Sequence, residues 1–109
     1  MSYKYVSLDH EGPIAEIFLN RPEVLNAYHL DMLNELKAAL KEVFSEDESK
    51  VLMITGRGSK AFSVGADINW LEDLSQKEAK ASSWLGKEIC NIIEEGDKVV
   101  IAAVNGYKK

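Results

Sequence analysis

Cysteine is almost absent from this sequence, and its scarcity limits what can hold the fold together. The one cysteine, Cys90, has no second cysteine with which to form an internal disulfide. A single thiol is typical of proteins from a reducing compartment, so we expect a cytoplasmic location. Its neighbours Ile89, Ile92 and Ile93 are apolar, which predicts that the thiol lies in the core.

Long apolar runs and clusters of basic residues are also missing. No stretch approaches the ~18 consecutive apolar residues of a membrane span, and no charged-then-apolar leader opens the chain. The net charge is -5, and acidic residues separate the basic ones, which argues against a nucleic-acid backbone as partner. We therefore expect neither a membrane nor nucleic acid, and instead a small molecule or a protein as partner.

The chain has enough residues for one small domain. Its 109 residues are 46% hydrophobic, so residues 1–109 can share one core. Residues 3–10 alternate as a half-buried strand does, and after a turn at residues 11–13 a second strand is predicted over residues 14–19. Pro22 cannot continue a central strand, and a polar loop is expected through Asn26. The start of the chain is thus predicted to be a hairpin.

Helical spacing dominates the rest of the sequence. Apolar residues fall three or four apart over residues 30–44, which predicts an amphipathic helix. A buried strand over residues 51–54 should be parallel to an earlier one, because a helix intervenes. A short helix is expected over residues 68–74. Ser75 and Glu78 match a capping box, which predicts that a second long helix begins there. This helix is expected to end at Gly96, in the left-handed conformation. Residues 99–104 form the last predicted strand.

Residues 61–70 are the stretch around which the chain is organised. They follow a strand and a glycine-containing loop, and they lead into a helix. Gly65 and the small Ala66 stand where a helix begins, so backbone N–H groups are left without intrahelical acceptors. Such a place can hold an anion, or an oxygen that becomes one during a reaction.

Other readings of these residues are less specific. Residues 56–60 contain glycines and a lysine but lack the spacing of a phosphate-binding loop, so an ordinary turn after a strand is expected. The two histidines are far apart in the sequence, so no metal site is predicted. His29 is expected to be a helix cap. Trp70 and Trp84 are expected to pack in the interior, with Trp70 a candidate for the wall of a ligand pocket. Asp67 taken alone fits a carboxylate that stabilises a helix start.

Several linked motifs resemble one protein family. In chain order they are Leu-Asn-Arg-Pro at residues 19–22, Leu-Asn-Ala at 25–27, Lys-Ala-Phe-Ser-Val-Gly-Ala-Asp-Ile at 60–68 and Ala-Ala-Val-Asn-Gly-Tyr at 102–107. Their order and spacing resemble the amino-terminal part of the enoyl-CoA hydratase/isomerase (crotonase) superfamily. The resemblance implies an α/β, crotonase-like (ClpP/crotonase) fold built as a β-β-α superhelix, here incomplete.

The resemblance implies a chemistry and a set of site residues. In this family a thioester enolate is stabilised by two backbone N–H donors, and Ala66 matches the first of them. The same loop contacts coenzyme A, so the implied contacts are Val24, Leu25, Asp67, Ile68 and Asn69. Coenzyme A belongs to the acyl-CoA substrate, and no separate cofactor or metal is implied.

The resemblance also implies residues that this sequence does not supply. In the family, the second donor and the catalytic glutamates follow the asparagine-glycine turn, where this chain has Lys108 and Lys109. The implied function is therefore the acyl-CoA-binding half of a hydratase or isomerase that is inactive alone. Trimers or hexamers are implied for the family. The alternative is a non-catalytic module that binds CoA esters or takes part in assembly.

Overall fold

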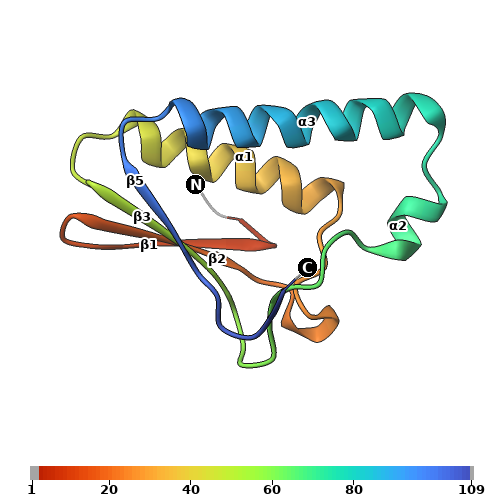
Figure 1. Ribbon diagram of the computed structural model, residues 1–109, viewed down its shortest axis with the longest axis horizontal. Coiled ribbons are helices and arrows are strands. Elements are labelled where there is room, and N and C mark those ends of the chain that lie inside the picture. Colours follow the sequence, from red (N-terminus) through yellow and green to blue (C-terminus); the bar gives the residue numbers. More distant parts are fainter. Residues whose placement is uncertain (1–2, 109) are drawn as a thin grey trace.

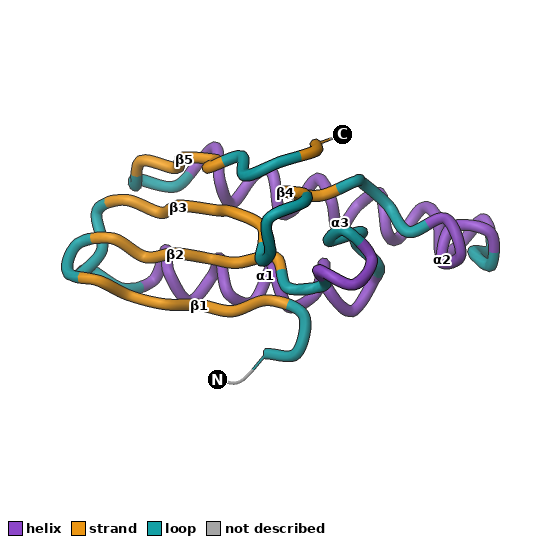
Figure 2. Tube along the Cα trace, turned by 90° about the horizontal axis from the view of Figure 1, so that it is seen from below, coloured by secondary structure: helices purple, strands orange, loops and turns teal. Residues whose placement is uncertain are grey.

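The computed structural model describes residues 3–108, and a four-stranded sheet is its largest feature. The spatial order of the strands is β1-β2-β3-β5, as Figure 2 shows. The strands are β1 (Val6–Glu11), β2 (Ile14–Leu19), β3 (Val51–Gly56) and β5 (Val99–Ala103). Helices α1 (Leu30–Ser45) and α3 (Gln76–Glu95) lie along one face of this sheet (Figure 1). The fold therefore has two layers, and within residues 3–108 the other face of the sheet carries no helix.

The pairing of the strands confirms the predicted hairpin and the predicted parallel strand. β1 and β2 are antiparallel, whereas β2 pairs with β3 and β3 with β5 in parallel. The first strand begins at Val6 and ends at Glu11, which is later than predicted. The reason is that the Tyr5 N–H donates to Glu35 Oε1 of α1 at 2.6 Å. Tyr3 and Tyr5 are thus both held by side chains of α1, since the Tyr3 hydroxyl donates to Glu42 Oε1.

The core lies between the sheet and the two helices. Ala15, Ile17 and Leu19 alternate along β2 and point toward the helices, as the period of two in a strand requires. They pack with Leu52 of β3 and with apolar residues of both helices, namely Met32, Leu40, Val43, Leu85 and Ile89. Burial of these side chains is the main force that stabilises the layer.

The predicted helices are present, with two differences at their ends. α1 spans one residue more than predicted, and α3 begins with the predicted capping box at Ser75 and Glu78. α2 (Ile68–Glu72) ends before Leu74. Gly96 follows α3 with φ of -69°, so the predicted left-handed conformation is wrong. Glycine is needed there because a side chain would collide with the ring of Phe44.

Two predictions about buried side chains on α3 are wrong. Cys90 is exposed and not a core thiol, and Trp84 is 66% exposed and does not pack in the interior. Leu85 and Ile89 are buried, and they fix which face of the helix meets the core. Cys90 lies one residue past Ile89, so the helical rotation turns it away from the core. The Lys87 ammonium lies 5.7 Å from the centroid of the Trp84 ring.

A second, small sheet was not predicted. β4 (Ala61–Ser63) pairs in parallel with β6 (Tyr107–Lys108), far along the chain (Figure 2). β3 also runs two residues further than expected, to Gly56, and the expected polar loop contains a 3-10 helix, η1 (Pro22–Val24). A side chain at Gly106 would meet the Lys60 carbonyl, so glycine permits this close approach. No helix within residues 3–108 has the length and apolarity to cross a membrane.

Candidate functional site

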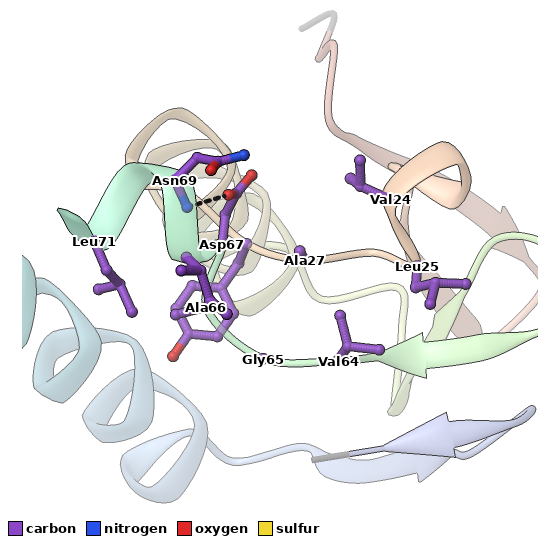
Figure 3. A pocket seen from close by; sticks show the side chains of 11 residues that line it. Val24, Leu25, Ala27, Val64, Gly65, Ala66, Asp67, Asn69 and Leu71 are labelled. Carbon is purple, nitrogen blue, oxygen red and sulfur yellow. Dashed lines mark hydrogen bonds between the residues drawn. The ribbon is translucent and has the colours of Figure 1, made fainter. Parts of the chain in front are cut away.

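A cavity lies between the loop after β2 and the start of α2. Its volume is about 790 Å³. Figure 3 shows the side chains that line it. All six residues predicted to bind the substrate line it, although they come from two segments 41 or more residues apart in the chain. The lining comprises Val24, Leu25, Ala27, Tyr28, Val64, Gly65, Ala66, Asp67, Ile68, Asn69 and Leu71. The fold therefore brings the predicted residues together, while their individual roles stay predictions.

A parallel bridge between Tyr28 and Ala66 joins the two segments. The Tyr28 N–H donates to the Gly65 carbonyl at 2.9 Å, and the Asp67 N–H donates to the Tyr28 carbonyl at 2.8 Å. In such a bridge the groups of Gly65 and Asp67 face Tyr28, so those of Ala66 between them face the other way. The Ala66 N–H donates to none of the described residues. Among the described residues this amide thus has no acceptor, and Ala66 is part of the cavity wall.

Gly65 makes the bend that leads to this donor. Its φ is +95°, which residues with a side chain rarely adopt. Its N–H donates to Ser63 Oγ at 3.1 Å, and that hydroxyl in turn donates to the Asn26 carbonyl at 2.8 Å. The glycine is therefore required by the backbone conformation, a reason that the sequence prediction did not give.

Asp67 begins α2 and faces two partners. Its Oδ1 accepts from the Asn69 N–H at 3.0 Å, which is the N-cap contact expected of a carboxylate at a helix start. Its Oδ2 lies 3.3 Å from Arg21 Nη1, and the two side chains are only 18% and 14% exposed. The side chain therefore has a structural role, and its predicted contact with CoA stays a prediction.

The cavity has an apolar rim that remains open to solvent. Val24 and Leu25 are exposed, and Ile68 is 69% exposed. Single exposed apolar residues are common, but several around one cavity are typical of a binding site. The hydrophobic surface at this end of the molecule is consistent with a ligand that is partly apolar.

Asn26 is a supporting residue whose role the sequence reasoning missed. It is 1% exposed and has φ of +57°. Its Oδ1 accepts from the Arg21 N–H, and its Nδ2 donates to the carbonyls of Arg57 and Ala61. It thus joins the loop after β2 to the segment before the bend. The available signal was an asparagine in a loop, within the Leu-Asn-Ala motif, because asparagine tolerates the left-handed conformation.

A second cavity lies between α2 and α3, with a volume of about 450 Å³. It shares Tyr28, Ala66 and Leu71 with the first cavity, and Trp70 is in its wall. The ring centroids of Trp70 and Tyr28 are 6.3 Å apart, in an edge-to-face arrangement. The rest of the wall is mainly apolar or small: Leu33, Leu74, Ala79, Ser82, Ser83, Gly86, Ile89 and Cys90. Ala66 therefore stands where the two cavities meet.

The other sequence candidates have structural roles. His29 caps α1, since its Nδ1 accepts from the Met32 N–H at 3.3 Å, which confirms the predicted cap. The backbone of Gly56 is hydrogen-bonded to the side chain of Asn105. The Gly56 N–H donates to Asn105 Oδ1, and Asn105 Nδ2 donates to the Gly56 carbonyl. Among the described residues no three His, Cys, Asp or Glu side chains form a group able to hold a metal ion.

Comparison with known proteins gives one consistent result. A family model described as enoyl-CoA hydratase/isomerase matches residues 9–109. A crotonyl-CoA hydratase from Syntrophomonas wolfei is 40% identical over 107 residues, and a short-chain-enoyl-CoA hydratase from Clostridium acetobutylicum is 36% identical over 107 residues. Each alignment covers 98% of this chain but 41% of the relative.

Solved structures agree in fold. The crystal structure of an enoyl-CoA hydratase from Thermoplasma volcanium has a TM-score of 0.89 and 37% identity, and it is matched over 94% of this chain and 41% of its own. An enoyl-CoA hydratase from Bacillus anthracis also has a TM-score of 0.89, with 29% identity and coverage of 94% and 40%. The chain thus spans about two fifths of the length of the relatives it matches.

Proposed function

The chain belongs to the enoyl-CoA hydratase/isomerase family, and we propose that it binds an acyl-CoA thioester with the Ala66 N–H directed at the thioester oxygen. The family and the crotonase-like fold predicted from the sequence are confirmed, as is the restriction to the amino-terminal part. The observation that carries the proposal is the free Ala66 amide where the two cavities meet.

The proposed chemistry follows from where charge develops in the reaction. The thioester carbonyl oxygen gains negative charge when a proton leaves the carbon next to the carbonyl. It also does so when a nucleophile adds to the carbon–carbon double bond of a conjugated thioester. A fixed N–H donor that points at this oxygen stabilises the enolate by about 3 kcal/mol, since it needs no reorientation. Ala66 suits this role because a backbone donor needs only a small side chain beside it.

The two cavities suggest how the ligand is divided. We assign the CoA part to the larger cavity, against Val24 and Leu25 on one side and residues 67–69 on the other. The acyl group then enters the cavity between α2 and α3, whose wall includes Trp70. The thioester lies between these parts, beside Ala66. This arrangement is supported by the shared wall of the two cavities.

Proton transfer is assigned to the part of the family fold that this chain does not span. The resemblance implies a second donor and two glutamates beyond the asparagine-glycine turn, and the matched region covers 41% of the relatives. We therefore expect the chain to bind acyl-CoA but not to hydrate crotonyl-CoA. Turnover above the uncatalysed rate would contradict this assignment of roles.

The binding site is tested by a pair of glycine variants. Gly65 and Gly12 both have positive φ, so Gly65→Val and Gly12→Val strain the backbone in a similar way. Only Gly65 lies in the cavity wall, while Gly12 is in the β1–β2 turn with open space around it. We expect Gly65→Val to weaken crotonyl-CoA binding by about tenfold or more, as loss of roughly 1.4 kcal/mol would. Isothermal titration calorimetry gives the affinities, and equal effects of the two variants would contradict the site.

A second candidate function is a non-catalytic assembly module. It is favoured by one observation, that β5 is an edge strand of the large sheet and exposes Val99 and Ile101 at 60% and 46%. Exposed apolar residues on an unpaired edge favour association with another chain. Sedimentation velocity separates the candidates: an assembly module associates without CoA esters, and Ile101→Lys abolishes that association while leaving any CoA binding intact.

A further inference from the structure

The side chain of Arg21 contacts both segments that form the cavity. Its Nη1 donates to the Ala27 carbonyl at 2.7 Å and lies 3.3 Å from Asp67 Oδ2. The contact with Asp67 joins residues 46 apart in sequence, and both contacts are largely shielded from water, since the arginine side chain is 14% exposed. Arg21 is absent from the lining of both cavities near Ala66, so it does not itself meet a ligand there.

The two partners of Arg21 stand next to the bridge that orients the Ala66 amide. Ala27 directly precedes Tyr28, and Asp67 directly follows Ala66; both are labelled in Figure 3. Each strand of the bridge is therefore tied to the same guanidinium group. Two backbone hydrogen bonds hold the bridge itself, from Tyr28 to Gly65 and from Asp67 to Tyr28. The other hydrogen bonds between the two segments, at Ser63 and Val64, lie before Gly65. The guanidinium therefore adds a contact on the far side of Ala66, at Asp67.

Arg21 is itself held at both ends. Its backbone N–H donates to Asn26 Oδ1 at 2.8 Å, and its guanidinium lies 5.9 Å from the centroid of the Tyr5 ring. A planar guanidinium offers several donors in a fixed geometry, whereas a lysine is a flexible point charge. Arginine thus suits a position that must reach a carbonyl and a carboxylate together.

The charge of Arg21 has a second consequence for the cavity. Asp67 places a carboxylate on the residue after the Ala66 donor, where it would oppose negative charge on a bound oxygen. The guanidinium beside Asp67 Oδ2 offsets that charge in a place with little water to screen it. Both effects act directly on the oxygen that the Ala66 N–H meets, and they reach the CoA portion of the ligand only through Asp67.

We propose that Arg21 is a positioning residue that directs the Ala66 N–H at the thioester oxygen and neutralises Asp67 beside it. This inference rests on the proposed function and names the residue that makes the donor effective. Polarisation of the thioester, rather than affinity for coenzyme A, is the property that Arg21 controls.

The test uses the 109-residue chain and two probes, free CoA and cinnamoyl-CoA. The conjugated thioester of cinnamoyl-CoA absorbs at longer wavelength when its carbonyl oxygen is polarised, so the red shift on binding reports the donor directly. For Arg21→Gln we expect CoA affinity to stay within about twofold, a change near 0.4 kcal/mol, while the red shift falls by at least half. Arg21→Lys should lie between Arg21→Gln and the unaltered chain.

Two further variants keep the test decisive. Lys37→Gln removes another ion pair, with Glu88 at 2.6 Å between α1 and α3, and should leave the red shift unchanged. Arg21→Gln with Asp67→Asn restores a neutral pair that can hydrogen-bond and retains an N-cap, so it should recover part of the shift. This double variant also serves if Arg21→Gln alone does not fold, as judged by circular dichroism.

The outcomes separate the inference from the function beneath it. An unchanged red shift in folded Arg21→Gln, or equal weakening of CoA and cinnamoyl-CoA binding, would overturn the positioning role alone. A red shift in the double variant below that of folded Arg21→Gln, or absent where the single variant does not fold, would also overturn it. No red shift in the unaltered chain would overturn the proposed function, and this inference with it.

Discussion

The helix-and-sheet layer and the cavity region hold their shapes by different means. In the layer, side chains such as Ile17, Leu40 and Leu52 are fully buried and apolar, and the strands have ordinary backbone geometry. In the cavity region, Leu25, Asn26 and Gly65 have positive φ, and polar side chains bridge separate segments. Apolar packing tolerates small adjustments, whereas hydrogen bonds to single backbone atoms fix direction. The layer therefore supplies stability, and the polar region supplies precision.

The largest effect should come from the layer. Leu40→Ala removes a fully buried side chain between α1 and the sheet and should lower the free energy of unfolding by about 3 kcal/mol. Because Leu40 is remote from the cavity lining, the folded fraction should bind crotonyl-CoA with unchanged affinity. Urea denaturation with and without ligand measures both quantities. Weaker binding by the folded fraction would break the separation between the two regions.

A somewhat smaller effect on stability is expected in the polar region, together with a loss of binding. Asn26→Ala leaves the carbonyls of Arg57 and Ala61 without a donor and should cost about 2 kcal/mol. The loss should also loosen the bend at Gly65, since Ser63 is tied to the Asn26 backbone. We expect weaker crotonyl-CoA binding by the folded fraction, measured by the same titration. A variant that is destabilised but binds normally would show that the cavity does not depend on this network.

The smallest effect concerns the end of the layer opposite the cavity. Hydrogen bonding to Ser49 is the main cause that lowers the pKa of Glu46, and the charge of His10, at 2.9 Å, adds to it. A lowered pKa in the folded state means that the ionised carboxylate stabilises the fold. That contribution is present above the ordinary glutamate pKa and is lost as the pH falls through the folded one, from about pH 5 downward.

The comparison variant for this effect is Glu46→Gln. It should be less stable than the unaltered chain at neutral pH by under about 1 kcal/mol, and the difference should vanish in acid. Thermal melts at several pH values measure this trend, and CoA-ester affinity at neutral pH should be the same in both chains. A difference that grows as the pH falls would have the wrong sign and would exclude this explanation.

Much of the layer could be predicted because its signals are local. The spacing of Leu36 and Leu40 follows the helical period, and the capping box at Ser75 depends on residues three apart. The errors occur where contacts between distant segments decide the outcome. Gly96 is extended because Phe44 of α1 lies against it, and β4 forms because β6 returns beside it. Neither contact leaves a trace in the neighbouring residues.

The candidate site was predicted in part. The motif around Gly65 and Ala66 indicated a backbone donor, and the resemblance implied its neighbours as CoA contacts. Arg21 and Asn26 were quoted only as parts of a motif, since nothing in their spacing shows that they reach Asp67 and Ala61. A side chain's partners across 35 or 46 residues depend on where the sheet and helices place the loops.

The sequence by itself determined the family, the order along the chain of the four strands of the large sheet and the three α-helices, and the place of the bend before α2. These follow from local periodicity, caps and motif residues, which act over a few positions along the chain. The tertiary structure alone decided that the Ala66 N–H has no acceptor within residues 3–108. That outcome depends on Tyr28, 38 residues earlier, which pairs with the Gly65 carbonyl and the Asp67 amide on either side. A hydrogen bond has direction, and direction is set only when both segments are placed in space.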